Sequence, residues 1–484
     1  MADEIYDTIV VGAGVAGLSA AVAARETGAS VLVLDRATSS EHGGNTRYTE
    51  AFLRMKSVSE VADDFESHFH ENAAGLVDPA LISETLNSPE KWSPLLRSLS
   101  FADPTVVSAF ADASGPTLQW LQGFGIRFEP LPSPFITTAT SRLAPVGGGA
   151  QILESLVAEA QRTGVEFAFE TTATDLLREG HAIVGVEGYG AGHRSVTFRG
   201  RQVVLASGGF EGNQELLTRY IGPKAVHTRP VAKGGYYNKG EGIEMALRAG
   251  AAPCGDYGLF HAEPIDPRSG IAEPALFIFP YGLLVNSAGH RFVDEAPATV
   301  DATYESITRR IFDQEGGSAF VVLDAKLADV PNRQVAIRTD QPPLQAESLE
   351  GLAALMGVPP VAFARTVGDY NAACPDGDGF DPLRVDGLAT EGLEIPKSNW
   401  SRPIDSAPFQ AYPIAAANVF TFGGLKVDAH AQVLDRDGNP IPGLYAAGET
   451  VGLYFGTYTG STSVLKGAVF GRLAGMAATT PAAS

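Results

Sequence analysis

Cysteine, basic charge and long apolar runs are all scarce in this 484-residue chain. Its two cysteines, Cys254 and Cys374, form no CxxC or CxxCH motif, so we expect no iron–sulfur cluster, c-type haem or structural zinc site. The 56 acidic residues outnumber the 35 basic ones and give a net charge of -21, which repels nucleic acids and anionic membrane surfaces. No run of 18 or more apolar residues predicts a membrane span.

Signals for export are also lacking in the sequence. Residues 1–7 are polar and acidic, and the first apolar run belongs to a strand rather than to a signal peptide. We therefore expect a cytoplasmic protein with no nucleic-acid partner. A length of 484 residues with 44% hydrophobic residues predicts a globular protein of more than one domain.

What the chain does contain is a nucleotide-binding pattern at residues 5–35, IYDTIVVGAGVAGLSAAVAARETGASVLVLD. Gly12 permits a tight turn after the first strand, Gly14 lets the backbone approach a pyrophosphate, and Gly17 lets the helix pack closely on the sheet. The helix N-terminus then directs N–H groups at phosphates, and Asp35 follows at the spacing for a ribose hydroxyl. The residues expected to contact a dinucleotide here are Gly12, Gly14, Val15, Ala16, Gly17, Asp35 and Arg36. This unit alone suits either FAD or NAD.

Further segments bear on the choice of cofactor. GGNT at 43–46 directly follows the second strand, and RQVVLASGGFEGN at 201–213 is a strand that ends in a Ser-Gly-Gly turn. GLYAAGETVG at 443–452 is a short apolar strand that delivers Gly448 and Glu449. STSVLKGAVFGRLAG at 461–475 reads as a helix whose N-terminus faces a flavin.

Together with the first unit, these segments resemble the flavoprotein superfamily of fumarate reductases and 3-ketosteroid dehydrogenases over nearly the whole chain. The resemblance implies an α/β fold with a Rossmann-like FAD-binding domain interrupted by an α+β cap domain, the catalytic one. It also implies FAD as the cofactor. Because no iron–sulfur cluster or haem is expected, electrons are expected to pass directly from the flavin to a diffusible electron acceptor or to another protein. The further residues that the resemblance assigns to the cofactor are Gly43, Gly44, Asn45, Thr46, Gly208, Gly209, Gly448, Glu449, Ser463 and Val464.

Domain boundaries are expected where the character of the sequence changes. Residues 1–230 form the first part of the FAD-binding domain, residues 231–408, which are rich in turns, form the cap, and residues 409–484 complete the FAD-binding domain. Chemistry in this superfamily takes place where the cap meets the flavin.

The motifs by which fumarate reductases hold a dicarboxylate are altered in this chain. The position of the cap histidine is Tyr237, the proton-donating arginine is replaced by Val300 or Asp301, and a further arginine becomes Tyr458. The His-His-Thr stretch appears as VFTFGG at 419–424. Because a buried carboxylate pair needs cationic partners, these replacements argue against fumarate reduction.

The same replacements favour a ketone substrate. The resemblance to ketosteroid dehydrogenases implies that Tyr458 and the Gly460 N–H bind the carbonyl oxygen while a second tyrosine removes the α-proton. Tyr304, Tyr237 and Tyr236 are the candidates for that base. We expect the aromatic side chains of Tyr454, Phe455, Phe420 and Phe422 to form the pocket wall, and His261 to be a structural histidine in a polar cap loop.

Other stretches, such as YYNKGEGIEMAL and YTGSTSVLKGAVFGR, resemble tricarballylate dehydrogenase. A carboxylate anchor then remains available in Arg47, Arg54 or Arg142, although a surface position is the simpler expectation for Arg54. The sequence thus favours an FAD-dependent desaturase of a cyclic ketone or cyclic oxo acid, such as a 3-ketosteroid or 4-oxocyclohexanecarboxylate. A polycarboxylate dehydrogenase or fumarate reductase-like enzyme is the second class, and a non-catalytic flavin-binding protein is the third.

Overall fold

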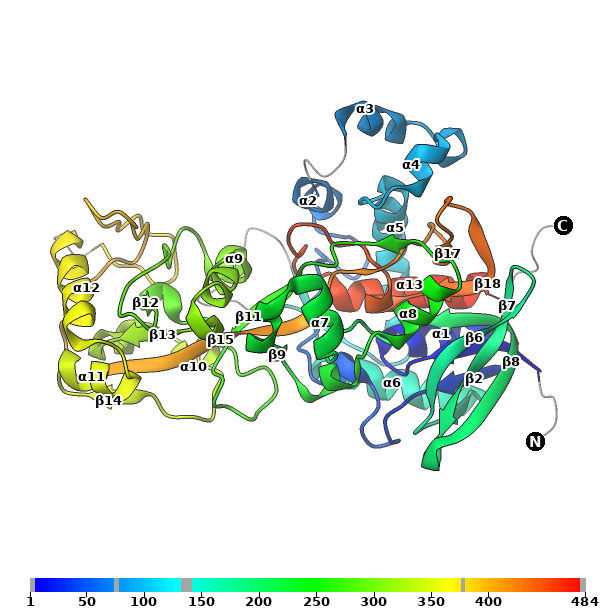
Figure 1. Cartoon of the computed structure of the whole chain (residues 1–484), viewed down its shortest axis with the longest axis horizontal. Coiled ribbons are helices and arrows are strands. Elements are labelled where there is room, and N and C mark those ends of the chain that lie inside the picture. Colours follow the sequence, from blue (N-terminus) through cyan, green and yellow to red (C-terminus); the bar gives the residue numbers. More distant parts are fainter. Residues whose placement is uncertain (1–4, 74–77, 132–141, 376–378, 479–484) are drawn as a thin grey trace.

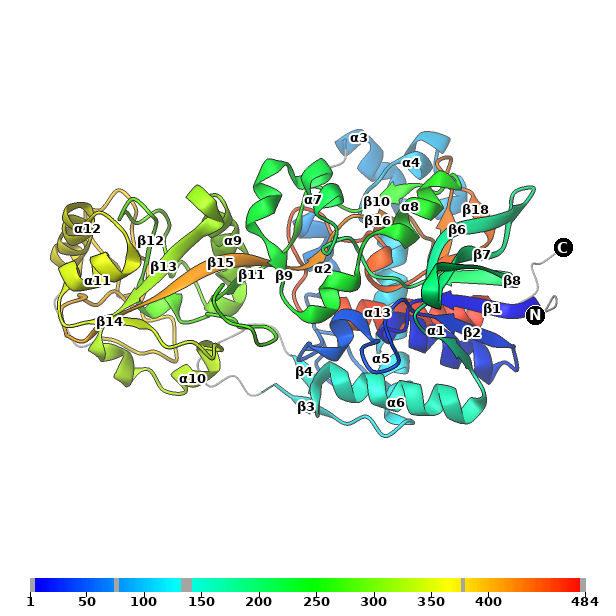
Figure 2. The same ribbon diagram turned by 60° about the horizontal axis from the view of Figure 1, so that its bottom comes forward.

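The computed structural model describes residues 5–73, 78–131, 142–375 and 379–478. Residues 1–4, which contribute to the expected absence of an export signal, lie outside these ranges. The chain forms two lobes, each built around its own β-sheet (Figures 1 and 2). One long strand, β15 (Phe409–Thr421), runs from the distal lobe towards the first sheet.

The first sheet has eight strands, in the order β17-β18-β8-β1-β2-β5, with β7 paired to β8 and β6 paired to β7. Their bounds are β1 Ile5–Val11, β2 Val31–Leu34, β5 Glu166–Ala168, β6 Thr172–Glu179, β7 Ala182–Gly190, β8 Arg194–Leu205, β17 Gln432–Leu434 and β18 Pro440–Ala446. β18, β8, β1, β2 and β5 are parallel, and Val10 lies opposite both Val33 and Val204. Strand β2 and the second half of β1, from Thr8 to Val11, consist of β-branched residues and leucine because both faces of these strands are covered.

Helices cover this sheet. α1 (Val15–Glu26) is buried along its first ten residues, as expected for an alanine-rich helix that lies between the sheet and other helices. It packs on α13 (Ser463–Ala477) and on α6 (Gly148–Thr163), and Figure 2 shows α13 running beside α1. The carboxyl ends of β1, β8 and β18 therefore meet the N-termini of α1 and α13 at one edge of the sheet.

A second group of helices lies above that edge. It comprises α2 Phe65–Asn72, α3 Pro79–Ile82, α4 Pro94–Ser98 and α5 Pro104–Gln122. α5 begins where Asp103 caps it, because the Asp103 carboxylate accepts the Thr105 N–H at 2.9 Å and proline occupies the first helical position. Short antiparallel pairs, β3 Phe128–Pro130 with β4 Leu143–Pro145 and β10 Pro253–Cys254 with β16 Gly424–Leu425, complete this lobe.

The second sheet is antiparallel along the path β11-β15-β13-β12, and β14 and the two-residue β9 also pair with β15. The bounds are β9 Arg229–Pro230, β11 Phe260–Ile265, β12 Leu283–Val285, β13 Ser318–Leu323 and β14 Leu344–Ala346. β15 pairs with β13 along its first half and with β11 along its second half, and it ends at Thr421 beside the first sheet. This strand therefore carries residues of the second lobe's sheet to the junction of the two lobes.

The remaining helices are α7 Gln214–Ile221, α8 Glu241–Arg248, α9 Val300–Phe312, α10 Arg333–Ala336, α11 Leu349–Met356 and α12 Pro360–Ala373. One apolar cluster, which includes Ile278, Ile307 and Ile414, packs α9 against the second sheet. Another, which includes Leu352, Phe363 and Val367, packs α11 and α12 against it.

The predicted cap, residues 231–408, contains β11 to β14 and α9 to α12. The predicted return point at 409 is the first residue of β15, which belongs by pairing to the second sheet. The three boundaries stay predictions.

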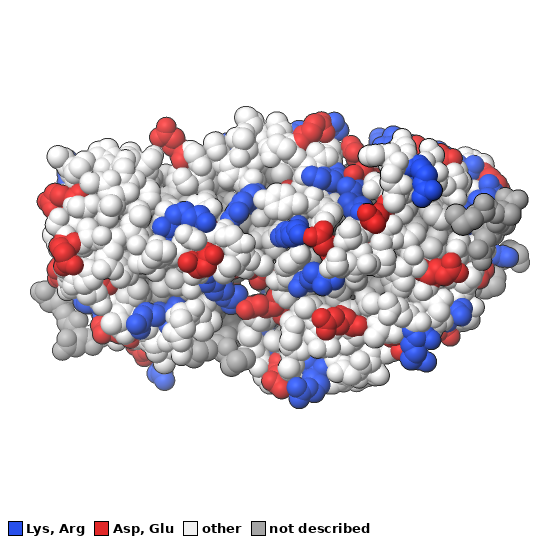
Figure 3. Space-filling model, turned by 90° about the horizontal axis from the view of Figure 1, so that it is seen from below, with Lys and Arg blue, Asp and Glu red and all other residues white. Residues whose placement is uncertain are grey.

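On the face drawn in Figure 3, Lys and Arg side chains are interspersed with Asp and Glu, although the chain as a whole is strongly acidic.

Candidate active site

A long cleft lies at the edge of the first sheet. Most of the predicted cofactor residues line it: Gly12, Gly14, Val15, Ala16, Asp35, Arg36, Gly43, Gly44, Asn45, Thr46, Gly208, Gly448, Glu449, Ser463 and Val464. Gly17 and Gly209 lie behind this lining.

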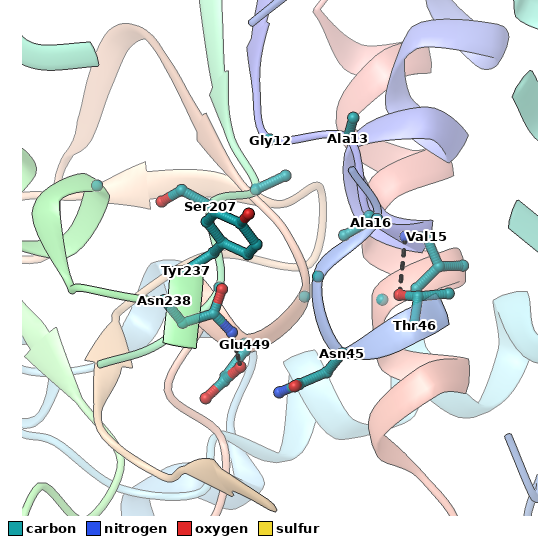
Figure 4. Close-up of a pocket in the computed structure, with 18 of the residues that line it drawn as sticks. Gly12, Ala13, Val15, Ala16, Asn45, Thr46, Ser207, Tyr237, Asn238 and Glu449 are labelled. Atoms are coloured by element: carbon teal, nitrogen blue, oxygen red, sulfur yellow. Dashed lines mark hydrogen bonds between the residues drawn. The ribbon is translucent and has the colours of Figure 1, made fainter. Parts of the chain in front are cut away.

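The glycine turn at the start of α1 shapes one end of the cleft (Figure 4). Gly12 has a φ of +108°, and a Cβ atom there would clash with the Ala206 carbonyl at the end of β8, so both backbone geometry and space require glycine. The Val15 N–H donates to Thr46 Oγ1 at 3.1 Å, which joins the α1 N-terminus to the 43–46 turn. The helix N-terminus and this turn together present backbone donors of the kind that bind a pyrophosphate.

Asp35 lies in the cleft wall at the end of β2. Its carboxylate accepts the N–H groups of Ala13 and Ala37, both at 2.8 Å, while burial raises its pKa above the ordinary value. A carboxylate has about four lone-pair sites, so two remain available for hydroxyl donors. Arg36 is paired with Glu241 of α8 at 2.7 Å and lies on the same wall.

At the other end of the cleft, polar side chains gather around Glu449. Its Oε1 accepts the N–H of Thr421, the last residue of β15, at 2.8 Å, and Figure 4 shows Glu449 below Asn238. Gly209 packs directly on this carboxylate, and a Cβ at Gly209 would clash with it. The donor set of backbone N–H groups, hydroxyls and carboxylates along the cleft fits the phosphates, ribose and ribityl hydroxyls of FAD.

Asn238, Ser207 and Lys466 are among the lining residues that were not assigned to the cofactor from the sequence. Ser207 belongs to the Ser-Gly-Gly turn and Lys466 to the 461–475 segment, whereas Asn238 stands in neither motif. Asn238 directly follows Tyr237, and it points into the cleft because a short helical turn, 233–237, ends there. Nothing in the local sequence distinguished it from an exposed loop residue.

Aromatic side chains close the cleft at the junction with the second lobe. Phe420 and Tyr454 line the cleft, and both pack edge-on against the ring of Tyr458, with ring centroids 5.0 and 5.2 Å from it. The Tyr458 hydroxyl accepts the N–H groups of Thr462 at 2.9 Å and Ser463 at 3.0 Å. It also donates to Ser463 Oγ at 3.1 Å, so it caps the N-terminus of α13.

The Gly460 N–H, which was expected to act together with the Tyr458 hydroxyl, is not one of the N–H groups that bond to that hydroxyl. The N–H groups at the Tyr458 oxygen belong to Thr462 and Ser463, and the Gly460 carbonyl accepts a bond from Arg54 at 3.2 Å. The pairing of Tyr458 with Gly460 on a substrate carbonyl stays a prediction.

His261 lies beside Tyr458, and its ring centroid is 4.4 Å from the tyrosine ring. The expectation of a polar loop was wrong, because His261 is a buried residue of β11. Its Nε2 lies 2.7 Å from the Tyr304 hydroxyl, and burial, with a smaller effect of Arg309, lowers the pKa of His261 to about 3. Burial also raises the pKa of Tyr304 well above its ordinary value. The pair is therefore a neutral imidazole in contact with a neutral phenol.

The three candidate bases have different surroundings. Tyr304, on α9, reaches Tyr458 through the intervening ring of His261. Tyr237 lines the cofactor cleft and donates to Glu41 at 2.6 Å, whereas Tyr236 is 48% exposed. Tyr304 is therefore the one candidate of the three that lies near the Tyr458 aromatic cluster.

α9 is also tied directly to the segment that carries Tyr458. Glu305, the residue after Tyr304, accepts the Tyr458 N–H at 3.0 Å and the Thr457 hydroxyl at 2.8 Å. Its other oxygen pairs with Arg309 at 2.7 Å. These bonds fix the distance between α9 and the Tyr458 turn.

Two of the three arginines considered as anion anchors lie near this turn. Arg54 is buried, at 3% exposure, and pairs with Asp64, so the expected surface position was wrong. The side chain of Arg142 is 6% exposed, donates to Ser461 Oγ at 2.7 Å and lies 3.5 Å from Asp301. Arg47 instead donates to the His42 carbonyl in the 43–46 region.

Among residues 5–73, 78–131, 142–375 and 379–478, no three His, Cys, Asp or Glu side chains are arranged to hold a metal ion. Of the helices in these ranges, none combines the length and apolarity that a bilayer crossing needs. Cys254 is buried, and burial raises the pKa of its thiol.

The family model of an FAD-binding domain matches residues 7–465. The chain belongs to this FAD-binding family. It is 28% identical to NADH:acrylate oxidoreductase of Vibrio harveyi over 98% of the chain, and it spans about half the length of that relative, 50%. It is 27% identical to vinyl phenol reductase of Lactiplantibacillus plantarum, with 94% of the chain and 92% of the relative covered.

Solved structures place the fold in the same superfamily. The 3-ketosteroid-Δ4-(5α)-dehydrogenase of Rhodococcus jostii RHA1 superposes with a TM-score of 0.67 at 25% identity over 99% of this chain and 97% of that one. Fumarate reductases are also among the relatives and structural neighbours. The resemblance inferred from the sequence, the fold class and FAD as the cofactor are thereby confirmed. The relatives are oxidoreductases acting on C=C or CH–CH groups, which agrees with the predicted enzyme class.

Proposed function

We propose that this protein is an FAD-dependent dehydrogenase that introduces a C=C bond next to the carbonyl group of a cyclic ketone or cyclic oxo acid. The observation that carries this proposal is the aromatic cluster of Tyr458, Phe420 and Tyr454 at the flavin end of the cleft, with the His261–Tyr304 pair against it. A wall of this kind suits an alicyclic ring and one polar oxygen. FAD, when bound, supplies the hydride acceptor.

Tyr458 is proposed to hold the carbonyl oxygen of the substrate. Its oxygen already accepts two backbone N–H groups, from Thr462 and Ser463, and such chains of hydrogen bonds strengthen the next bond that the hydroxyl donates. To bind a ketone, the hydroxyl hydrogen turns from Ser463 Oγ to the carbonyl oxygen. A donor aimed at developing enolate charge contributes roughly 10²–10³ in rate.

Tyr304 is proposed to exchange the α-proton with the substrate, and His261 to position it. With the hydrogen of His261 on Nε2, the imidazole donates to the Tyr304 oxygen and leaves that phenol's own hydrogen directed elsewhere. The same N–H stabilises the oxygen when the phenol loses its proton. Because burial favours the neutral phenol, removal of an α-proton is expected to require high pH.

Arg142 is proposed to bind the carboxylate of an oxo acid. Arg142 is a buried cation beside the Tyr458 turn, and its contact with the Asp301 carboxylate, at 3.5 Å, is longer than a close ion pair. A substrate with a ketone on Tyr458 and one carboxylate on Arg142 matches a 4-oxocyclohexanecarboxylate-like oxo acid. A 3-ketosteroid-like ketone would use Tyr458 alone.

A second candidate is the reverse chemistry, reduction of a C=C bond conjugated to a carbonyl group. The observation that favours it is the neutral state of the buried Tyr304, which suits a proton donor better than a base. Relatives named acrylate oxidoreductase, vinyl phenol reductase and urocanate reductase are consistent with this direction. A tricarballylate-type polycarboxylate dehydrogenase is the third.

The test is anaerobic mixing of the purified FAD-containing protein with cyclohexanone, 4-oxocyclohexanecarboxylate, a 3-ketosteroid and tricarballylate. The expected result is rapid bleaching of the flavin by a saturated cyclic ketone or oxo acid and none by tricarballylate. The chemically reduced protein is mixed in parallel with the matching enones, acrylate and fumarate. Reoxidation by acrylate or fumarate, with no ketone reducing the flavin, would overturn the dehydrogenase proposal in favour of the reductase.

A further inference from the structure

Two glutamates from distant parts of the sequence meet beside the cofactor cleft. Glu211 follows the Ser-Gly-Gly turn at the end of β8 and is 1% exposed. Glu449 follows β18 and faces the cleft. One amide nitrogen, Nδ2 of Asn238, lies within hydrogen-bond distance of both carboxyl groups, so the two groups lie side by side, and a shared proton would remove their mutual repulsion.

Two asparagines hold Glu211 in place. Its Oε1 accepts Nδ2 of Asn45 at 2.8 Å and Nδ2 of Asn238 at 2.5 Å. Nδ2 of Asn238 also reaches Oε2 of Glu449 at 3.5 Å, as Figure 4 shows, so this amide bridges the pair. The second oxygen of Glu211, Oε2, receives no donor from the described residues. An acceptor oxygen buried without a donor is costly, whereas a carboxylic acid O–H at that position donates to Glu449.

The other groups that face the pair do not remove this need for a proton. Lys466 of α13 lies close enough to Glu449 to interact with its charge, but its Nζ is bonded to the Val451 carbonyl at 2.8 Å, and burial lowers its pKa to about 7. The centroid of the Tyr454 ring lies 4.4 Å from Nζ of Lys466. Burial raises the pKa of Tyr454, so its phenol stays neutral. One cation against two buried carboxylates balances a single negative charge. Burial and the charge of Glu449 accordingly raise the pKa of Glu211 well above its ordinary value.

We propose that Glu211 is a protonated positioning residue, which donates its hydrogen to Glu449 and keeps the pair at a single negative charge in the FAD-bound protein. Glu449 then presents a fixed carboxylate to the cofactor. Loss of the proton would place a second negative charge in the same buried cluster and would turn Glu449 away from Glu211. FAD bound over Glu449 excludes water from the pair and further favours the shared proton. This inference rests on the FAD assignment and not on the substrate proposed above.

The test compares the FAD-loaded wild-type protein with Glu211→Gln, which keeps the shape and an amide donor to Glu449 but carries no titratable proton. Glu215→Gln, an exposed position on α7 in the same segment, is the matched control. Infrared spectra are recorded in the region of the protonated carboxyl C=O stretch. The difference spectrum between the wild type and Glu211→Gln is expected to contain a protonated carboxyl band, and the difference spectrum between the wild type and Glu215→Gln is expected to contain none.

The second measurement is the rate at which bound FAD dissociates as the pH is raised, followed by the fluorescence of released FAD. The wild-type rate is expected to increase by up to about tenfold per pH unit above the second pKa of the pair, while the rate of Glu211→Gln stays flat. An unchanged carboxyl band in Glu211→Gln, or identical pH profiles for the two proteins, would overturn the proposal.

If Glu211→Gln does not fold, Glu449→Gln is a second variant that tests whether Glu211 carries the proton. Burial alone keeps Glu211 neutral in that variant, so its band is expected to persist at a shifted position because its partner is now an amide. Disappearance of the band would show that Glu211 does not hold the proton and would overturn the proposal.

Discussion

Replacing Tyr458 by phenylalanine removes one oxygen atom from the candidate active site, and that atom has one structural and one proposed chemical task. In the structure, the oxygen accepts the N–H groups of Thr462 and Ser463 at the start of α13. Without it, the buried Thr462 N–H loses its acceptor, which costs about 1–3 kcal/mol in the free energy of unfolding. If the hydroxyl also binds the substrate carbonyl, turnover falls by roughly 10²–10³.

Tyr454→Phe is the matched control for this variant. The Tyr454 hydroxyl lies in the same aromatic cluster and contacts the same turn, where it bonds to Thr462 Oγ1 at 2.9 Å. Its removal breaks one neutral side-chain bond and leaves the backbone N–H groups of α13 capped. We expect a loss of about 0.5–1.5 kcal/mol in the free energy of unfolding and little change in turnover.

Denaturant unfolding of both FAD-loaded variants gives the change in the free energy of unfolding. Rapid mixing with the reducing substrate gives the rate of flavin reduction. The two tasks of Tyr458 separate in this comparison. A Tyr458→Phe protein that is destabilised but reduces its flavin as fast as Tyr454→Phe would refute the carbonyl role and leave the hydroxyl as a helix cap.

Three further changes test the surroundings of this oxygen. Tyr304→Phe should abolish the rise of the dehydrogenation rate with pH, which in the wild type is expected to approach about tenfold per unit because a phenol of raised pKa must first lose its proton. Arg142→Leu should raise KM for an oxo acid by about 10- to 150-fold, the equivalent of one charged hydrogen bond, and leave a neutral ketone unaffected. Glu263→Gln should stabilise the protein at pH 8 but not at pH 5, by up to about 3 kcal/mol, as measured by denaturant unfolding.

The sign of the last prediction follows from the surroundings of Glu263, which lies on β11 two residues after His261. Burial raises the pKa of Glu263 from 4.5 to about 7, against a smaller opposing effect of Arg338. A raised pKa in the folded state means stability that is present at low pH and is lost as the pH rises through about 7. Because glutamine does not titrate, the Glu263→Gln protein does not lose stability in this way as the pH rises. Equal pH profiles of unfolding for the two proteins would contradict the assignment.

Exposed residues provide the controls for these variants. Tyr236→Phe should leave the pH profile of dehydrogenation unchanged, and Arg310→Leu, on the exposed side of α9, should leave KM for the oxo acid unchanged. A Tyr304→Phe protein with the wild-type pH profile would exclude Tyr304 as the proton-exchanging group. Equal increases in KM for oxo acid and ketone in Arg142→Leu would indicate loss of structure rather than loss of a carboxylate contact.

The cofactor half of the site could be predicted because its signals are local. A glycine turn, a strand and the acid that ends the next strand all lie within residues 5–35, and their spacing is fixed by one βαβ unit. The segments at 443–452 and 461–475 could likewise be read as a strand and a helix. The sequence did not reveal Asn238 or Lys466, because each acquires its position from elements far away in the chain.

The substrate half was harder to predict for a related reason. β11 contains His261, Glu263 and Pro264, a composition typical of a loop, yet it is fully buried because β15 pairs with it from more than 150 residues away. The proximity of Tyr304 to His261 depends in turn on how α9 packs on that strand. Neither relation leaves a periodic pattern in the local sequence, so the three candidate tyrosines could not be ranked from it.

The partners of the two buried arginines, Arg54 and Arg142, bear on how many carboxylates a substrate at the Tyr458 turn can carry. Arg54 is engaged by Asp64 through two nitrogens, at 3.2 and 2.5 Å, and also donates to the Gly460 carbonyl. Arg142 faces Asp301 at the longer distance of 3.5 Å and donates to Ser461 Oγ at 2.7 Å, so a substrate carboxylate at Arg142 would compete with Asp301 for the guanidinium. A further carboxylate that binds at Arg54 would have to displace Asp64, and leaving a buried charge without its partner costs several kcal/mol. The arrangement therefore favours a substrate with a single carboxylate, or none, over a tricarboxylate.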